Sequence, residues 1–152
     1  MTYVTAEARQ ELLDAVAEAV DSIGSALASV GEAYEQLDDA SADRLEAEIF
    51  RPVQLAYGRA KRTHDGFAER HELPAGTFEP ALRGHPSQGV KGFLEGATQA
   101  AAHADTVLST LQDSMMPVEV GDQELRAGLA DVRDILSYLP PRTRRFVSLL
   151  GR

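Results

Sequence analysis

Residues 83–91 combine basic, hydroxyl and imidazole side chains around two glycines, a mixture that suits the binding of an anion. Arg83 and Lys91 could supply positive charge, Ser87 a hydroxyl donor and His85 an imidazole. If a helix begins near residue 87, its free backbone N–H groups and the positive end of its dipole would also favour an anion there. The stretch therefore predicts a site for a small anionic compound, formed by a loop and the first turn of the following helix.

A purely structural role also explains the same residues, and it is the interpretation we favour, because opposite charges around the end of a bundle are ordinary. Ser87 could cap the helix, and the bases could pair with acidic residues early in the chain, namely Glu7, Glu11 and Asp14. The stretch is not a P-loop, because the glycine and lysine spacing of that motif is absent. Both interpretations stay open at the level of the sequence.

His64 and His71 lie seven residues apart, which places both on one face of a helix and raises a hypothesis of metal binding. Bundle proteins with di-iron centres use Glu-x-x-His pairs. None of the four histidines here has a glutamate three residues before it. The alternative is that these histidines lie at the edge of a core and are hydrogen-bonded by their neighbours. We therefore expect no metal or other cofactor, and rank metal binding through His64 and His71 third among the functions.

The elements that position these residues can be predicted from the spacing of apolar residues. The longest regular pattern is a series of apolar residues whose spacing alternates between three and four positions. This period is typical of a long helix that buries one edge against other helices. A second, parallel series uses mainly alanine and serine, whose small side chains would let a neighbouring helix approach closely. The main series is Leu13, Val16, Val20, Ile23, Leu27, Val30, Tyr34 and Leu37, and the small-residue series is Leu12, Ala15, Ala19, Ser22, Ala26, Ser29 and Ala33.

The same period recurs three times along the chain. We predict helices over about 6–38, 43–72, 87–116 and 122–139, with a short amphipathic segment over 142–150. Pro52 should kink the second helix near residues 48–50 or divide it, because proline removes a helical hydrogen bond. Pro140 and Pro141 should end the fourth helix. The prolines and glycines of 73–86 predict a long loop, which we expect Leu73 and Phe78, together with Leu82, to hold at the end of the bundle.

Four such helices predict an all-α fold, an antiparallel up-down-up-down four-helix bundle that occupies the whole chain, 1–152, as one domain. In this order of helices, one end of the bundle would gather most of the bases together with three histidines. The fourth helix is about half as long as the first, so part of the long helices would lack a fourth wall unless the tail, the loop or a second subunit covered it. This mismatch is our argument for a homodimer.

The composition narrows the class of function. A net charge of −9 argues against nucleic-acid binding. The chain has no cysteine, no signal-peptide pattern and no apolar run long enough to span a membrane, so we expect a cytoplasmic protein. No serine–histidine arrangement or Gly-x-Ser-x-Gly motif indicates a nucleophile. Our leading hypothesis is a non-enzymatic bundle that acts by self-association and by interaction with another protein. Binding of an anionic compound is the second hypothesis.

Overall fold

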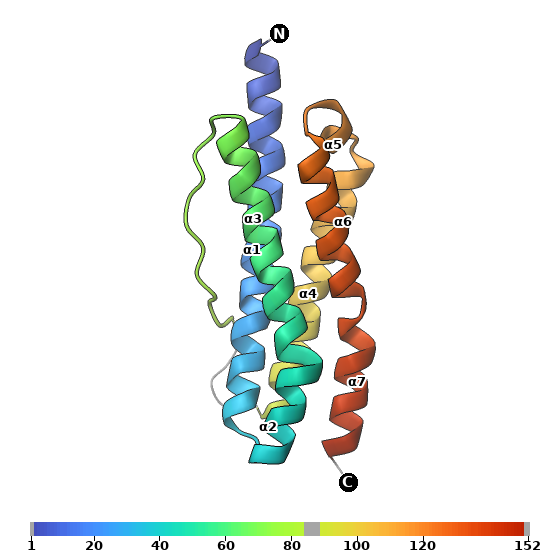
Figure 1. Cartoon of the computed structure of the whole chain (residues 1–152). Helices are drawn as coiled ribbons and strands as arrows, with labels where there is room; N and C mark the ends of the chain where they lie inside the picture. Colours follow the sequence, from blue (N-terminus) through green and yellow to red (C-terminus); the bar gives the residue numbers. More distant parts are fainter. Residues whose placement is uncertain (1, 84–88, 151–152) are drawn as a thin grey trace.

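The computed structural model describes residues 2–83 and 89–150, and within these ranges every regular element is a helix. This confirms the predicted all-α bundle (Figure 1). In chain order the elements are α1 (Thr2–Glu35), α2 (Asp39–Leu45), the π-helical turn η1 (Glu46–Phe50), α3 (Arg51–Arg70), α4 (Val90–Asp113), α5 (Met116–Glu119), α6 (Gln123–Ser137) and α7 (Leu139–Leu150).

The helices form four rods, because α2, η1 and α3 are continuous and α7 follows α6 almost directly. Their apolar series face a shared core, as the spacing predicts. Most residues of the main apolar series of α1 are buried, and so are Leu125, Leu129, Val132 and Leu136 of α6. Tyr34 is an exception near the end of α1, where its side chain is exposed.

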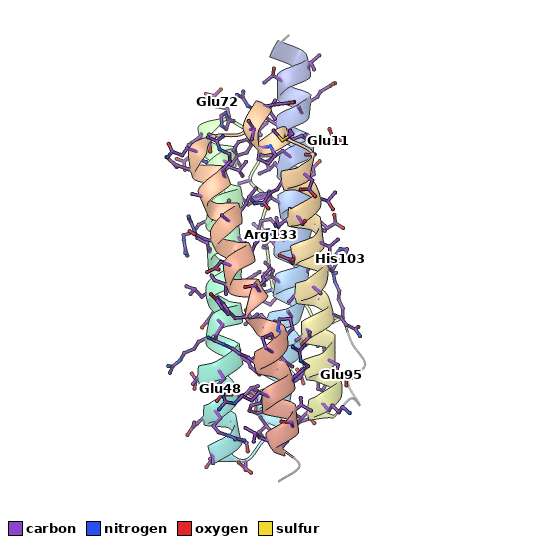
Figure 2. All side chains as sticks on the ribbon, turned by 90° about the vertical axis from the view of Figure 1, so that its right-hand side faces the viewer. Glu11, Glu48, Glu72, Glu95, His103 and Arg133 are labelled. Atoms are coloured by element: carbon purple, nitrogen blue, oxygen red, sulfur yellow. The ribbon has the colours of Figure 1, made fainter. Side chains whose placement is uncertain are left out.

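The direction of α4 differs from the prediction. The predicted up-down-up-down order would make α4 antiparallel to α3, whereas α4 runs parallel to it (Figure 1). Figure 2 shows the same relation, since Glu48 and Glu95 lie toward one end of the molecule and Glu72 lies at the other. The rods that pack against each other are nevertheless antiparallel, because α1 contacts α3 and α4, and the α6–α7 rod contacts the same two.

The loop after α3 makes this order possible, since it passes along the side of the bundle instead of across its end (Figure 1). An extended chain covers about 3.3 Å per residue, so the 19 residues between α3 and α4 can span the roughly 30 Å length of α3. Leu73, Phe78 and Leu82 pack against the core, as predicted, but from the side. The expectation that they hold the loop at the bundle end is therefore wrong.

The small-residue series of α1 packs against α4. The most extensive contact between helices joins α1 and α4. Alanines from both helices are buried there, and a Cβ placed on Gly96 of α4 would lie only 4.0 Å from the hydroxyl oxygen of Ser29. Small side chains thus allow these two helices to pack closely.

Pro52 lies in the first turn of α3, directly after the π-helical turn. The irregularity predicted near residues 48–50 is therefore present, although the helical run from Asp39 to Arg70 continues through it. A proline has no N–H to donate to the carbonyl four residues earlier, which here belongs to Glu48. That carbonyl instead accepts a hydrogen bond from the guanidinium of Arg142, at 3.3 Å.

The rod formed by α6 and α7 is longer than the predicted fourth helix, because Pro140 and Pro141 occupy the first turn of α7. Proline is tolerated in a first turn, where a backbone N–H has no helical partner. The helix can therefore resume after a break at Tyr138, and the predicted short C-terminal helix is confirmed in extended form. Because α6 and α7 together complete the fourth wall, the helix-length mismatch no longer argues for a dimer.

Among the described helices, none combines the length and the apolar character needed to cross a membrane.

Candidate functional site

The described residues of the two predicted sites, Arg83 and Lys91 for the anion and His64 and His71 for the metal, do not gather at one end of the bundle. His71 follows the last residue of α3, whereas Lys91 lies in the first turn of α4, at the other end of the bundle (Figure 1). The prediction placed both at one end because it assumed that α4 begins where α3 finishes. The basic end of the bundle expected from the sequence is therefore not formed. His85 and Ser87 lie outside the described residues.

His64 has a structural environment. Its side chain is buried, and its Nδ1 lies 2.9 Å from a carboxylate oxygen of Asp65. Phe78 of the long loop meets the imidazole edge to face, with ring centroids 4.8 Å apart. His64 thus forms part of the surface on which the loop packs.

His71 belongs to an ion-pair cluster around Asp122, the residue that caps α6. The Asp122 carboxylate accepts hydrogen bonds from Arg70 at 2.7 and 2.9 Å, and from the backbone N–H of Leu125 at 2.8 Å. The Nε2 atom of His71 lies 3.0 Å from the same carboxylate. Arg70 also donates to Glu124, at 2.8 Å. This cluster joins the end of α3 to the start of α6.

The electrostatics of Asp122 follow from these contacts. Partial burial alone would raise the pKa of its carboxyl group. The hydrogen bonds from Arg70, Leu125 and His71 favour the charged form more strongly, and the pKa of Asp122 lies well below its ordinary value. In the described ranges, no group of three or more histidine, aspartate and glutamate side chains has a geometry that could hold a metal ion. The third hypothesis, metal binding through His64 and His71, therefore gains no support from the geometry.

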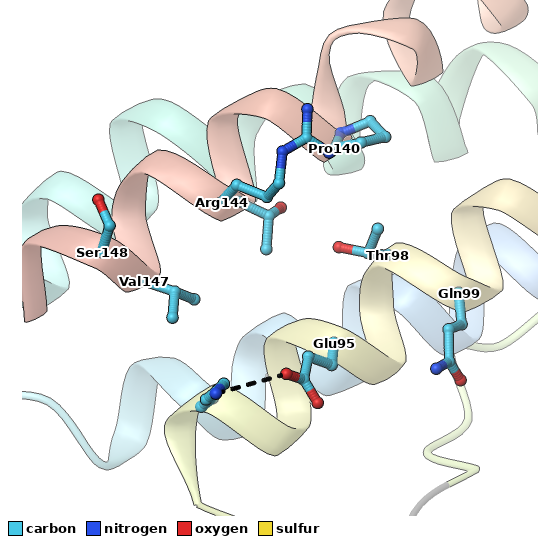
Figure 3. A pocket seen from close by; sticks show the side chains of 9 residues that line it. Glu95, Thr98, Gln99, Pro140, Arg144, Val147 and Ser148 are labelled. Carbon is cyan, nitrogen blue, oxygen red and sulfur yellow. Dashed lines mark ion pairs between the residues drawn. The ribbon is translucent and has the colours of Figure 1, made fainter.

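Lys91 lies in a groove of about 420 Å³ between α4 and α7 (Figure 3). Its ammonium group is 4.0 Å from a carboxylate oxygen of Glu95, one helical turn further along α4. Val147 and Ser148 face the groove from α7, with Pro140 at its other end. Lys91 is thus near a carboxylate of its own helix and lines a different cavity from Arg83.

Arg83 lines a different cavity, of about 300 Å³, between α1, α4 and the long loop. We call this cavity the serine pocket; it is lined by Ser22, Ser25 and Ser29 of α1, Arg83 of the loop, and Gly96, Gln99, Ala100 and His103 of α4. Two of these serines, Ser22 and Ser29, belong to the small-residue series of α1, from which only close helix packing was predicted. The signal for a polar pocket is the hydroxyl groups, which recur on one face of a helix that otherwise uses alanine.

A second feature is an exposed apolar surface where the rods of α3 and α6 meet. We call it the α3–α6 face; it comprises Ala47, Arg51, Pro52, Leu55, Arg59, Arg62, Asp131, Asp134, Ile135, Tyr138 and Arg142. Two shallow grooves, of about 300 and 260 Å³, share Leu55 and Ile135. Sequence reasoning missed this face, although Leu55 and Tyr138 are large apolar residues that fall outside the core series.

Comparison of the chain with models of known families, with curated proteins and with solved structures found no match.

Proposed function

We propose that this protein is a non-catalytic helical bundle that acts by associating with a second copy of itself through the α3–α6 face. The observation that carries the proposal is the exposure of two large apolar side chains at the centre of that face. Leu55 is 58% exposed and Tyr138 is 51% exposed, and both line the larger of the two grooves. Covering a leucine side chain contributes roughly 1.5–3 kcal/mol.

The surroundings of these side chains also suit a protein interface. Arg51 and Arg142 line the groove that contains Tyr138, and Arg142 lies over the tyrosine ring, 5.8 Å from its centroid. Arginine and aromatic residues are enriched at the energetically important positions of interfaces. An apolar centre surrounded by arginines therefore favours a protein partner for this face.

The charges of the face favour a second copy as that partner. An interface between two identical copies related by a two-fold axis pairs a surface with itself, so it needs both signs of charge. The face has both: Arg59 is paired with Asp131 at 2.9 Å, while Arg62 and Asp134 have no ion-pair partner among the described residues. Arg62 of one copy and Asp134 of the other are therefore available to pair across the interface. A face with arginines alone would repel its own copy.

The test is sedimentation velocity over a wide range of protein concentration, with the wild type and two variants. Leu55→Glu places a charge at the centre of the face, and we expect it to convert a dimer into a monomer. Val118→Glu is the matched control, because Val118 is also 58% exposed but belongs to α5, and we expect it to leave the dimer intact. Circular dichroism should show unchanged helicity for both variants.

Two results would reject the proposal. One is a wild-type protein that stays monomeric at every concentration, which would leave the face to a different protein. The other is an equal loss of association in both variants, because the effect would then come from added negative charge on an acidic protein and not from the α3–α6 face.

A further inference from the structure

The serine pocket is lined by serine side chains whose hydroxyls have no hydrogen-bonding role inside the described part of the bundle. Ser22, Ser25 and Ser29 are only 2, 3 and 6% exposed, and all three line the cavity. Their hydroxyls have no hydrogen-bond partner among the described residues. Thr98 of α4 behaves differently, because its hydroxyl donates to the carbonyl of Leu94 within its own helix, at 3.0 Å. Among the described residues, the hydroxyl of Tyr57 is the only fully buried side-chain polar atom without a partner, so the serine hydroxyls open into the cavity. They are therefore available to hydrogen-bond to a molecule held there.

The long loop brings a positive charge to the same cavity. Arg83 lines it, and this guanidinium has no ion-pair partner among the described residues. The neighbouring residues 84–88 contain no aspartate or glutamate, so that stretch offers no carboxylate to neutralise it. The loop is placed by packing, since Phe78 meets His64 and Pro80 lies against Gly24 of α1. Leu82, directly before Arg83, also packs against the core, so the loop is held against the bundle next to the cavity.

Two further polar side chains complete the lining. Gln99 offers an amide, and His103 offers an imidazole whose Nε2 lies 3.2 Å from a carboxylate oxygen of Glu18. Figure 2 shows His103 on α4, at about the middle height of the bundle. The pocket thus presents hydroxyls, an amide, an imidazole and a guanidinium to a space of about 300 Å³.

We infer that the serine pocket binds the phosphate group of a small phosphorylated compound. Hydroxyls can donate to several oxygens of one phosphate, and a guanidinium binds phosphate with two parallel hydrogen bonds. The volume accommodates a small molecule, at the lower end of the range for ligand pockets. The site is distinct from the α3–α6 face, and binding here does not depend on self-association.

The test is an NMR titration of ¹⁵N-labelled protein with inorganic phosphate and then with glycerol 3-phosphate, at constant ionic strength maintained with sodium chloride. We expect amide shifts concentrated at Ser22, Ser25 and Ser29 and around Gln99. Arg83→Gln should weaken binding about tenfold or more, because it removes the charge and the paired hydrogen bonds that a guanidinium makes to phosphate. Ser25→Ala should weaken it several-fold.

Lys91→Gln is the matched control, since it removes a positive charge from the other side of α4 and should leave the affinity unchanged. Arg83 is in an exposed loop, so its replacement should not unfold the protein, and thermal melting checks this. The inference is overturned if millimolar phosphate shifts no amide in the pocket, or if binding survives Arg83→Gln and Ser25→Ala. It is also overturned if Lys91→Gln is the variant that loses binding, because the anion would then occupy the start of α4.

Discussion

At the scale of single residues, Asp122 has the largest electrostatic role. It caps α6, pairs with Arg70 and contacts His71, so one carboxylate joins two helices. The sequence predicts the cap, because an aspartate that follows a glycine and precedes a helical pattern is a favoured N-cap. The sequence could not predict the ion pair, because Arg70 is 52 residues away and the prediction placed it at the opposite, basic end.

Replacing Asp122 should separate these two contributions. Asp122→Asn keeps a good capping side chain but loses the charge, and we expect it to lower the free energy of unfolding by about 1 kcal/mol. Asp122→Ala loses both, and we expect a decrease of about 2 kcal/mol. Urea unfolding at neutral pH measures both values. Equal losses in the two variants would mean that the cap contributes nothing.

The effect of Asp122 should also depend on pH. Because the pKa of Asp122 is lower in the folded protein than in the unfolded chain, the unfolded chain takes up a proton first as the pH falls. The stabilising contribution is therefore complete at neutral pH and decreases progressively from about pH 5 to pH 2. The difference in stability between the wild type and Asp122→Asn should narrow over this range. A constant difference would show that the charge of Asp122 is not responsible.

At the scale of helices, α3 and α6 approach each other closely at Gly128. A Cβ placed on this glycine would lie 2.1 Å from the hydroxyl oxygen of Thr63 and 2.9 Å from its Cβ. That hydroxyl donates to the carbonyl of Arg59, at 2.8 Å, so Thr63 cannot turn away without losing a hydrogen bond. The pair therefore fixes how closely these helices pack.

Gly128→Ala should lower the free energy of unfolding by about 1–3 kcal/mol, although alanine is the better helix former, because the added methyl group overpacks the contact. Gly31→Ala is the matched control: nothing lies within 4 Å of a Cβ at that position of α1, and we expect a gain of about 0.5–1 kcal/mol. Thermal unfolding measures both. Adding Thr63→Ala to Gly128→Ala removes the contacts with the hydroxyl and methyl groups but keeps the Cβ at 2.9 Å, so it should restore part of the loss. No restoration at all would contradict the role assigned to the Thr63 side chain.

The helices themselves could be predicted from the sequence, but the direction of α4 could not. The spacing of Leu125, Leu129 and Val132 encodes burial directly, because each helical turn returns a side chain to the same face. The path of the long loop instead depends on contacts such as Phe78 with His64, which no local pattern encodes. Because the predicted basic end depended on that path, the grouping of the candidate site residues was wrong although the fold class was confirmed.

At the scale of the whole molecule, the two proposed surfaces lie on opposite sides of the bundle. The serine pocket lies along α1 and α4, whereas the association face lies along α3 and the α6–α7 rod. Because α1 and α4 form one packed pair and α3 and α6 another, a dimer formed through the α3–α6 face leaves the pocket open. Phosphate binding and self-association are therefore expected to be independent of each other.

Self-association through the α3–α6 face can be tested by measuring a distance between copies. The chain has no cysteine, so Ser137→Cys gives a single site for a spin label, next to Tyr138. Thr106→Cys, on the exposed surface of α4, gives the matched control. Double electron–electron resonance on the singly labelled proteins should give a short, narrow distance between copies for Ser137→Cys and a longer one for Thr106→Cys. An absence of dipolar coupling at Ser137→Cys, or a shorter distance at Thr106→Cys, would contradict the proposed association.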